Sequence, residues 1–343
     1  MAEATGIEIK SLYKIFGPNG KEMVQKVKDG MSKAELNEKF NHVLGLNDIN
    51  ISMPGGKIQV VMGLSGSGKS TLIRHINRLI DPTAGEVLYG SEDVCKMSPT
   101  ELREFRRHKT AMVFQKFALL PHRTVMKNAV YGLEIQGVAM NEAEERAARW
   151  IDRVGLEGFE DHYPNQLSGG MQQRVGLARA LTNDADILLM DEAFSALDPL
   201  IRMDMQTVLL DLQEELHKTI VFITHDLDEA LRLGDKIAIL RDGAVIQQGT
   251  GQEIVLRPAD AYISEFVKEV NRGRVILVDT VMDQSRTLEG GLSIPHGVML
   301  EEAAKTFADT GASEANVVNG SGAPIGVLTV QDTITAMVTP ASH

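Results

Sequence analysis

A glycine-rich segment early in the chain has the residue types and spacing needed to hold phosphate. Residues 63–70 read Gly-Leu-Ser-Gly-Ser-Gly-Lys-Ser. Glycines let backbone N–H groups turn toward phosphate oxygens, a lysine ammonium can reach the β- and γ-phosphates, and the final hydroxyl can ligate Mg²⁺. A glycine-rich turn with a surface lysine is the alternative. The predicted phosphate-binding residues are Gly63, Leu64, Ser65, Gly66, Ser67, Gly68, Lys69, Ser70 and Thr71.

Two consecutive carboxylates and a histidine follow apolar runs later in the chain. Asp191 and Glu192 come after 187–190, a run typical of a buried parallel strand. Open α/β sheets bind ligands at the carboxyl ends of such strands, so Asp191 can hold Mg²⁺ and Glu192 can polarise a water for attack on the γ-phosphate. His225, after the apolar run 220–223, is predicted to contact the γ-phosphate. The alternatives are a solvated acidic pair and an ordinary loop histidine.

A second glycine-rich segment, 167–173, reads Leu-Ser-Gly-Gly-Met-Gln-Gln. Ser168 can cap a helix predicted to run to Leu181, and Gly169 and Gly170 allow close backbone approach to an anion. A helix cap with no ligand is the alternative. Either glycine segment alone would fit many proteins, whereas both in this order fit very few.

Periodicity predicts the elements that must position these residues. The apolar run 58–62 forms a strand before the phosphate loop, and 71–79 forms a helix after it. Residues 7–16 are expected to open a small antiparallel layer. A helical subdomain at about 120–180, rich in Ala, Glu and Arg, is expected to carry the second glycine segment as a semi-independent arm.

Residues 18–45 interrupt the antiparallel layer. Ser32 and Glu35 form a capping-box pattern, which predicts the start of a helix. The apolar residues that recur at helical spacing after it are Leu36, Phe40 and Val43. We expect a short helical insert that packs as a flap near the edge of the nucleotide site. The alternative is an insertion without a function.

The composition changes after about residue 270, where 271–274 form a plausible linker. A second domain is predicted over 275–343. Its expected elements are a helix around 299–307, strands at 315–318 and 325–330 separated by a turn, and a closing helix opened by Asp332.

Composition narrows the class of protein. With 343 residues, 43% hydrophobic and 24% charged, the chain is expected to form a soluble globular protein of two domains. The net charge of −12 argues against a nucleic-acid clamp or a basic membrane-binding patch. A single cysteine excludes an internal disulfide and fits a reducing cytosol. The N-terminus has no secretory-signal pattern, and no apolar run reaches the ~20 residues of a spanning helix.

These motifs resemble those of the ATP-binding cassette (ABC) ATPases, in the family's order, over residues 7–270. The phosphate loop and the Asp191–Glu192 pair correspond to the family's two nucleotide motifs, and 167–172 correspond to its signature. The resemblance therefore implies ATP and Mg²⁺ as cofactors.

Several further assignments come from the resemblance alone. Gln115 corresponds to the Q-loop glutamine, a catalytic residue and Mg²⁺ ligand, and Asp198 to an ATP-site residue of the D-loop. His225 corresponds to the switch histidine. Phe16 falls where the family stacks an aromatic ring on adenine, and Tyr13 could compete for that role.

The implied fold is α/β. It comprises a P-loop NTPase ABC nucleotide-binding domain over 1–270, with a RecA-like core, an antiparallel β layer and a helical subdomain. A small α+β domain over 275–343 resembles a cystathionine-β-synthase-type (CBS) module, regulatory or dimerising. A single copy of this module is visible, so pairing across a homodimer would complete it, and an inert dimerisation tail is the alternative.

The resemblance also implies partners. The signature of one copy faces the phosphate loop of a second copy, so each ATP is buried between two chains. Residues 116–122 would line a groove for an integral membrane permease subunit, or they could equally be core residues.

The local sequence around residues 12–17, 61–68 and 111–119 is similar to that of the ATPases of glycine betaine/proline importers. That subfamily implies uptake of a quaternary-amine-type solute such as glycine betaine, proline betaine, choline or trimethylamine N-oxide. It also implies a solute-binding protein and a peripheral position at the cytoplasmic face of the inner membrane. The rival is a soluble ABC ATPase of DNA repair or translation, which the acidic charge disfavours.

Overall fold

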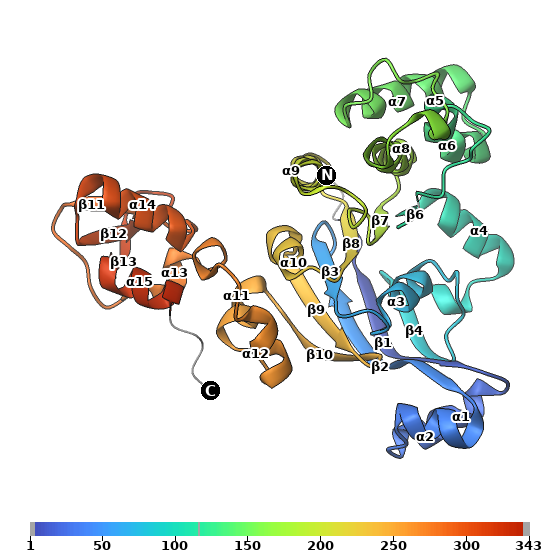
Figure 1. Cartoon of the computed structure of the whole chain (residues 1–343), viewed down its shortest axis with the longest axis horizontal. Helices are drawn as coiled ribbons and strands as arrows, with labels where there is room; N and C mark the ends of the chain where they lie inside the picture. The colour runs from blue at the N-terminus through green and yellow to red at the C-terminus, as the bar shows by residue number, and fades with distance from the viewer. Residues whose placement is uncertain (1–3, 116, 339–343) are drawn as a thin grey trace. The chain divides into compact units, whose positions relative to one another are not determined.

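The computed structural model describes residues 4–115 and 117–338. The chain divides into two compact units, one of residues 1–226 with 233–248 and the other of 227–232 with 249–343. Figure 1 shows the course of the chain. The boundary predicted near residue 270, between the nucleotide-binding domain and the C-terminal domain, stays a prediction, because a division into compact units does not by itself define functional domains.

The first unit is built around a sheet with the strand order β10-β9-β3-β8-β7-β6, whose pairs from β9 to β6 are parallel. Every residue of β3, β7 and β8 is buried, as expected for strands covered on both faces. The strands are β3 (Ile58–Met62), β6 (Thr110–Val113), β7 (Ile187–Asp191), β8 (Thr219–Thr224), β9 (Lys236–Arg241) and β10 (Ala244–Gly249). The predicted strand at 58–62 is therefore present with the bounds expected.

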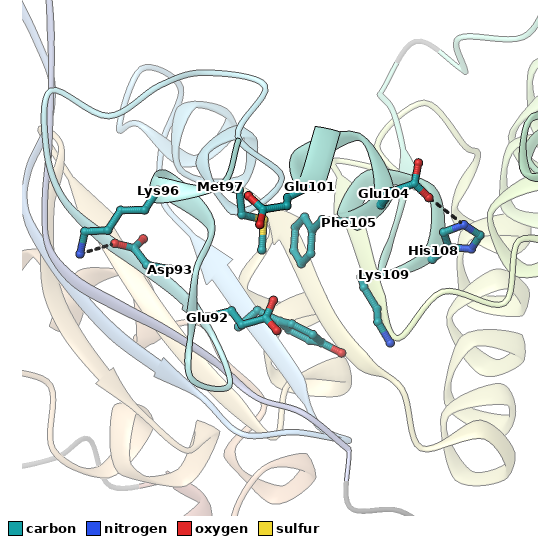
Figure 2. A pocket seen from close by; sticks show the side chains of 10 residues that line it. Glu92, Asp93, Lys96, Met97, Glu101, Glu104, Phe105, His108 and Lys109 are labelled. Atoms are coloured by element: carbon teal, nitrogen blue, oxygen red, sulfur yellow. Dashed lines mark ion pairs between the residues drawn. The ribbon is translucent and has the colours of Figure 1, made fainter. Parts of the chain in front are cut away.

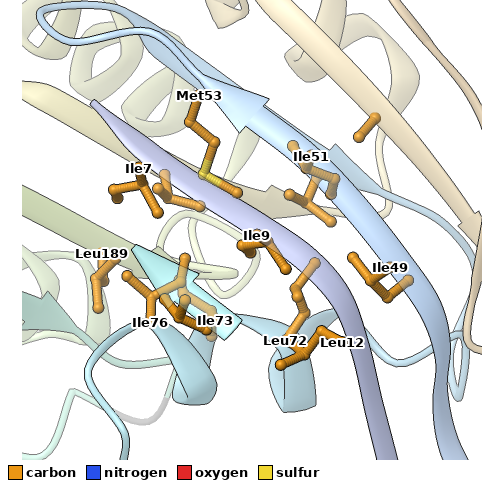
Figure 3. Close-up of a cluster of buried hydrophobic side chains, with 14 of the residues drawn as sticks. Ile7, Ile9, Leu12, Ile49, Ile51, Met53, Leu72, Ile73, Ile76 and Leu189 are labelled. Carbon is orange, nitrogen blue, oxygen red and sulfur yellow. The ribbon is translucent and has the colours of Figure 1, made fainter. Parts of the chain in front are cut away.

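A second, antiparallel sheet has the order β2-β1-β4-β5. It consists of β1 (Ile7–Phe16), β2 (Val43–Met53), β4 (Ala84–Tyr89) and β5 (Glu92–Asp93). Alternate residues of β1 and β2 point inward and pack on helix α3 (Lys69–Ile76), as Figure 3 shows. Ile9 and Ile51 lie in the same buried cluster as Leu72 and Ile73. This core holds the helix that follows the phosphate loop against both sheets.

The insert between β1 and β2 forms two helices, α1 (Gly20–Lys28) and α2 (Lys33–Phe40). The predicted capping box of Ser32 and Glu35 is present at the start of α2. Val43 was expected on this helix, but it begins β2 instead. The reason is local: Asn41 adopts a left-handed conformation with φ of 54°, which ends α2.

The helical subdomain consists of helices that pack on one another. These are α5 (Val125–Ala129), α6 (Tyr131–Gln136), α7 (Met140–Arg153) and α8 (Gly169–Thr182), with the 3₁₀ turn η2 (Pro164–Gln166). The helical arm expected over about 120–180 stays a prediction as a separate subdomain. Other helices of the first unit are α4 (Pro99–His108) and α9 (Pro199–Leu216), with the turn η1 (Val94–Lys96).

The second unit ends in a small sheet with the order β11-β12-β13. Its core comes from α14 and this sheet and includes Leu300, Ala303 and Phe307. Its elements are α10 (Leu227–Leu233), α11 (Gly251–Leu256), α12 (Ala261–Val267), η3 (Arg272–Arg274), α13 (Val278–Val281), β11 (Leu292–Pro295), α14 (Leu300–Thr310), β12 (Glu314–Val318), β13 (Pro324–Thr329) and α15 (Val330–Val338). The expected helix and two strands are present, and β11 is an additional strand parallel to β12. The closing helix was expected to open at Asp332, but it begins at Val330, so Asp332 lies in its first turn.

Candidate nucleotide site

The phosphate loop joins the carboxyl end of β3 to the first turn of α3. At two positions of this loop the backbone conformation favours glycine over residues with a side chain. Gly63 has φ of 151°, and a Cβ there would lie 2.2 Å from the Leu240 carbonyl oxygen. Gly68, the N-cap of α3, has φ of 105°. These conformations turn the loop around the helix N-terminus, where the helix dipole and free N–H groups favour an anion.

Lys69 is only 4% exposed and is held by the loop itself. Its Nζ donates to the carbonyl oxygens of Gly63 and Leu64, at 2.6 and 3.1 Å. Burial lowers the pKa of the ammonium, while Glu192 and Asp191 act against this shift. The lysine charge is thus directed at the centre of the loop, where phosphate oxygens would replace the carbonyl partners.

The donor set at the end of β7 fits Mg²⁺. Ser70 Oγ donates to Asp191 Oδ1 at 2.8 Å, so a hydroxyl and a carboxylate oxygen already face one another. Hard oxygen ligands of this kind suit Mg²⁺. Arg74 Nη2 lies 3.5 Å from Asp191 Oδ2. Sequence reasoning missed Arg74, although its position four residues after Ser70 places both on one helix face.

Glu192 is the residue around which the predicted catalytic side chains meet. Gln115 Nε2 donates to Glu192 Oε2 at 2.9 Å, and His225 Nδ1 lies 3.6 Å from the same oxygen. Lys69 Nζ lies 3.7 Å from Glu192 Oε1. These residues come from three strand ends and the start of α3. Gln115 was also predicted as an Mg²⁺ ligand, but in this structure its amide contacts Glu192 and not the Ser70–Asp191 pair.

The aromatic residues at the end of β1 differ in exposure. Tyr13 is 5% exposed and packs in the core of the insert, whereas Phe16 is 39% exposed. Lys14 Nζ lies 5.0 Å from the centroid of the Phe16 ring. Of the two candidates for stacking on adenine, only Phe16 therefore offers ring surface to a ligand.

The signature residues stand at the start of α8, in the helical subdomain. Ser168 caps the helix by accepting a hydrogen bond from the Met171 N–H at 3.3 Å. A Cβ added to Gly169 or Gly170 would meet its nearest neighbours at 3.8 and 3.6 Å, which is ordinary contact. The packing of this chain thus leaves room for a side chain at both glycines.

Asp198 lies beside the signature in this fold. It caps α9 by accepting from the Ile201 N–H at 3.1 Å. The neighbours that a Cβ on Gly170 would meet are Ile201 and Leu197, so the two predicted segments adjoin.

The segment after Gln115 is held to α8 by a residue that sequence reasoning missed. Lys116 lies outside the described residues. Phe117 and Ala118 both have left-handed φ, at 47° and 49°. Arg179 donates to the carbonyl oxygens of both, at 3.1 Å to Phe117 and 2.7 Å to Ala118. Burial lowers the pKa of this guanidinium. An Arg in a helix gives no sequence signal for such a contact.

A separate pocket of about 710 Å³ lies at α4, shown in Figure 2, and is lined by none of the predicted site residues. Two pairs of its polar side chains are in contact, Lys96 with Asp93 at 2.9 Å and His108 with Glu104 at 3.4 Å. Within residues 4–115 and 117–338, no helix has both the length and the apolar character needed to cross a membrane.

Comparison with known proteins identifies the family. A family model described as ABC transporter matches residues 46–195. The glycine betaine transport ATP-binding protein OpuAA of Bacillus subtilis is 53% identical over 282 residues, which are 82% of this chain and 68% of that protein. ProV of Escherichia coli, a glycine betaine/proline betaine transport system ATP-binding protein, is 46% identical over 97% of this chain and 83% of its own length.

Two further comparisons agree. The trimethylamine N-oxide transport system ATP-binding protein TmoW of Pelagibacter ubique is 47% identical over 82% of each chain. The solved dimeric structure of the ATP-binding cassette MJ0796 in a post-hydrolysis state, bound to ADP and Pi, matches with a TM-score of 0.62 and 33% identity over 71% of this chain and 98% of that one. Taken with the cluster around Glu192, these similarities show that the chain belongs to the ABC transporter ATPases, the ATP-binding subunits of ABC transport systems.

Proposed function

We propose that this chain is the ATP-hydrolysing subunit of an importer for a quaternary-amine-type solute, working through partner membrane subunits. The observation that carries the proposal is the convergence of Lys69, Gln115 and His225 on Glu192 at the carboxyl ends of the strands. A carboxylate in that place can act as a general base on a water beside the γ-phosphate.

The hydrolysis step follows from these residues. The loop 63–71 cradles the phosphates, and Phe16 stacks on adenine. Mg²⁺, which Ser70 and Asp191 would hold, would neutralise charge on the phosphate oxygens. Glu192 accepts a proton from the attacking water. The oxygen of that water bonds to the γ-phosphorus while the bond from phosphorus to the bridging oxygen of ADP breaks. His225 contacts the γ-phosphate.

A second copy of the chain completes each site. Ser168, Gly169 and Gly170 of one copy close over the γ-phosphate bound to the other, with Asp198 beside them. The free space at both glycines supports this arrangement, because their lack of a side chain is explained by a ligand that approaches from outside the chain. After hydrolysis, repulsion between the two anionic products loosens the pair.

Closure is coupled to transport through the membrane subunits. The segment 117–122 would receive a helix of an integral permease, and the closing movement would open the path across the membrane. In this proposal the protein sits at the cytoplasmic face of the inner membrane, bound through the permease, and a separate solute-binding protein delivers the solute. Nucleic acid is not a partner.

The solute is inferred from the relatives. OpuAA is named for glycine betaine, ProV for glycine betaine and proline betaine, and TmoW for trimethylamine N-oxide. These molecules share a methylated nitrogen, so the transported class is the same although the individual solute differs. Glycine betaine is our first candidate, and choline and trimethylamine N-oxide are the next.

The C-terminal elements would serve regulation. We place a CBS-like module over 275–343, paired across two copies through α14 and α15. A pocket of about 400 Å³ between these helices, lined by Phe307 and Ile334 among others, leaves apolar surface that a second copy could cover. Such a paired module could sense ionic strength or a cytosolic nucleotide.

Uptake of labelled glycine betaine tests the proposed function. Cells with the gene, without it, and with the Lys69→Ala variant would be compared, with choline and trimethylamine N-oxide as competitors. We expect uptake to be lost without the gene, not to be restored by the variant, and to be blocked only by betaines. Uptake that is independent of the gene would contradict a betaine importer, and competition by choline or trimethylamine N-oxide would reassign the solute.

A further inference from the structure

The helical insert is fixed to the antiparallel sheet by a core of its own. Leu36 of α2 is fully buried, and the capping box of Ser32 and Glu35 secures the start of that helix. The residues of this core are Tyr13, Ile15, Met23, Val24, Val27, Leu36 and Leu44. The place of α2 above β2 is therefore set by packing, so its outward side chains have defined positions.

A pocket of about 640 Å³ separates α2 from the turn between β9 and β10. Its lining residues are Ser32, Lys33, Ala34, Asn37, Val43 and Asp242. This volume is ample for a base and a sugar ring, and its wall combines apolar and polar groups, as small-molecule sites do.

The pocket adjoins Phe16, the ring proposed to stack on adenine. Val43, in the pocket wall, pairs directly with Phe16 across β1 and β2, so both side chains share one face of the sheet. Gly45 lies two residues after Val43 in β2, and a Cβ added to it would lie 2.7 Å from the Phe16 ring. The absence of a side chain at Gly45 lets the ring lie across β2 toward the phosphate loop.

The other side of the pocket adjoins the phosphate loop. The Gly243 N–H, next to Asp242, donates to the Ser67 carbonyl at 3.0 Å. A Cβ on Gly68 would lie 2.8 Å from the Gly45 carbonyl oxygen. The pocket therefore lies between the exposed aromatic ring and the rim of the loop, where the base and ribose of a bound nucleotide must pass.

Asn37 is the lining side chain with hydrogen-bonding capacity to spare. The Ser32 hydroxyl is engaged with Glu35, and Lys33 Nζ lies 3.8 Å from Asp242. The exposed Asn37 carboxamide has no hydrogen bond within the described part of the chain. A carboxamide offers an acceptor and two donors side by side.

We infer that α2 forms the outer wall of the base pocket and that Asn37 recognises the Watson–Crick edge of adenine. That edge presents the N6 amino donor beside the N1 acceptor, which the amide oxygen and nitrogen match. The inference rests on the proposed ATP-dependent function and adds base recognition by the insert.

Nucleotide binding to the full chain tests it, with Asn37→Ala, Asn37→Asp and, as a matched control on the exposed side of α2, Glu38→Ala. A carboxylate can only accept hydrogen bonds, so it loses the match to adenine N1 but can accept from the N1–H and amino group of guanine. We expect Asn37→Ala to weaken ATP binding about 3- to 10-fold, the effect of one or two hydrogen bonds. Asn37→Asp should weaken it at least as much and shift the ATP-to-GTP preference toward GTP.

Three outcomes would overturn the inference, and each can be told apart from the others. Wild-type ATP affinity and base preference in both Asn37 variants would remove Asn37 from the base site and leave the proposed function standing. Failure of the wild-type chain to bind ATP would overturn both. Equal weakening by Glu38→Ala would also contradict the inference, because it would show a general effect of altering α2. Asn37 is exposed and alanine favours helices, so folding is not at risk.

Discussion

At the scale of single residues, Glu192 has a conformation that few side chains adopt. Its φ is 47°, in the left-handed region, and its N–H donates to the Ile223 carbonyl oxygen at 3.1 Å. Its own carbonyl oxygen accepts from Ser195 Oγ at 2.9 Å. Backbone bonds on both sides thus hold an unfavourable conformation that directs the carboxylate toward Lys69, Gln115 and His225.

We predict that Glu192→Gln will bind ATP and associate with a second copy but hydrolyse ATP at least ~100-fold more slowly, because an amide cannot take the proton from water. Steady-state ATPase rates and nucleotide affinity would be measured together. Lys69→Ala is the comparison, and it should weaken ATP binding itself. Hydrolysis at the wild-type rate by Glu192→Gln would rule out the assigned base.

At the scale of elements, α3 carries a buried histidine that the proposed mechanism does not use. His75 Nδ1 lies 2.7 Å from the Thr71 carbonyl oxygen, and Nε2 is buried without a partner in the described part of the chain. Burial is the main cause that lowers its pKa from 6.5 to about 4. Helix α3 is therefore packed around a neutral imidazole, and its charged form is disfavoured by the fold.

This pKa predicts how stability depends on pH. Between pH 6.5 and about 4 the unfolded chain binds the proton and the folded chain does not, so the free energy of unfolding falls as pH is lowered through that window. The loss from this group amounts to about 3 kcal/mol at its lower end. His75→Asn keeps a donor for Thr71 but cannot titrate. Denaturant unfolding at pH 7.5 and pH 5 should show a smaller decrease in this variant, and an equal decrease would assign the pH dependence to other groups.

At the scale of the whole molecule, the chain holds two compact units with separate cores. The nucleotide residues lie in the first unit, and the second ends in the small sheet β11-β12-β13 with α14 and α15. Ile334 of α15 is 48% exposed and lines the apolar pocket beside Phe307, so it is the side chain to change when the proposed pairing is tested. Regulation and hydrolysis would thus reside in different parts of the chain.

Removal of residues 275–343 should change the salt dependence of solute uptake while basal ATPase activity stays intact. Ile334→Asp is a milder version, because it adds a charge to an exposed position without opening the core. Uptake would be measured over a range of external salt concentrations for both variants. Salt curves identical to that of the full chain would reduce this region to a packing role.

Features that depend on local order could be predicted from the sequence. The strand at 58–62, the capping box of α2 and the signature cap at Ser168 are set by residues near one another in the chain, and they are present as predicted. The helix predicted over 71–79 is also present, but it spans Lys69–Ile76. The family also followed from motif order, and the comparisons confirm it. Local spacing suffices in these cases because a cap, a turn or a helix start involves few residues.

Which distant side chains meet depends on how the elements pack in three dimensions. Gln115 and Glu192 lie 77 positions apart in sequence, and the parallel sheet brings them within hydrogen-bond distance. The choice between Tyr13 and Phe16 likewise depended on which ring the insert buries. Arg179 and Gly45 gave no recognisable sequence signal, because their contacts are with residues far along the chain. The role proposed for Asn37 likewise depends on what the fold places beside α2. Periodicity specifies which face of an element is buried, whereas sheet order and packing specify what lies against it.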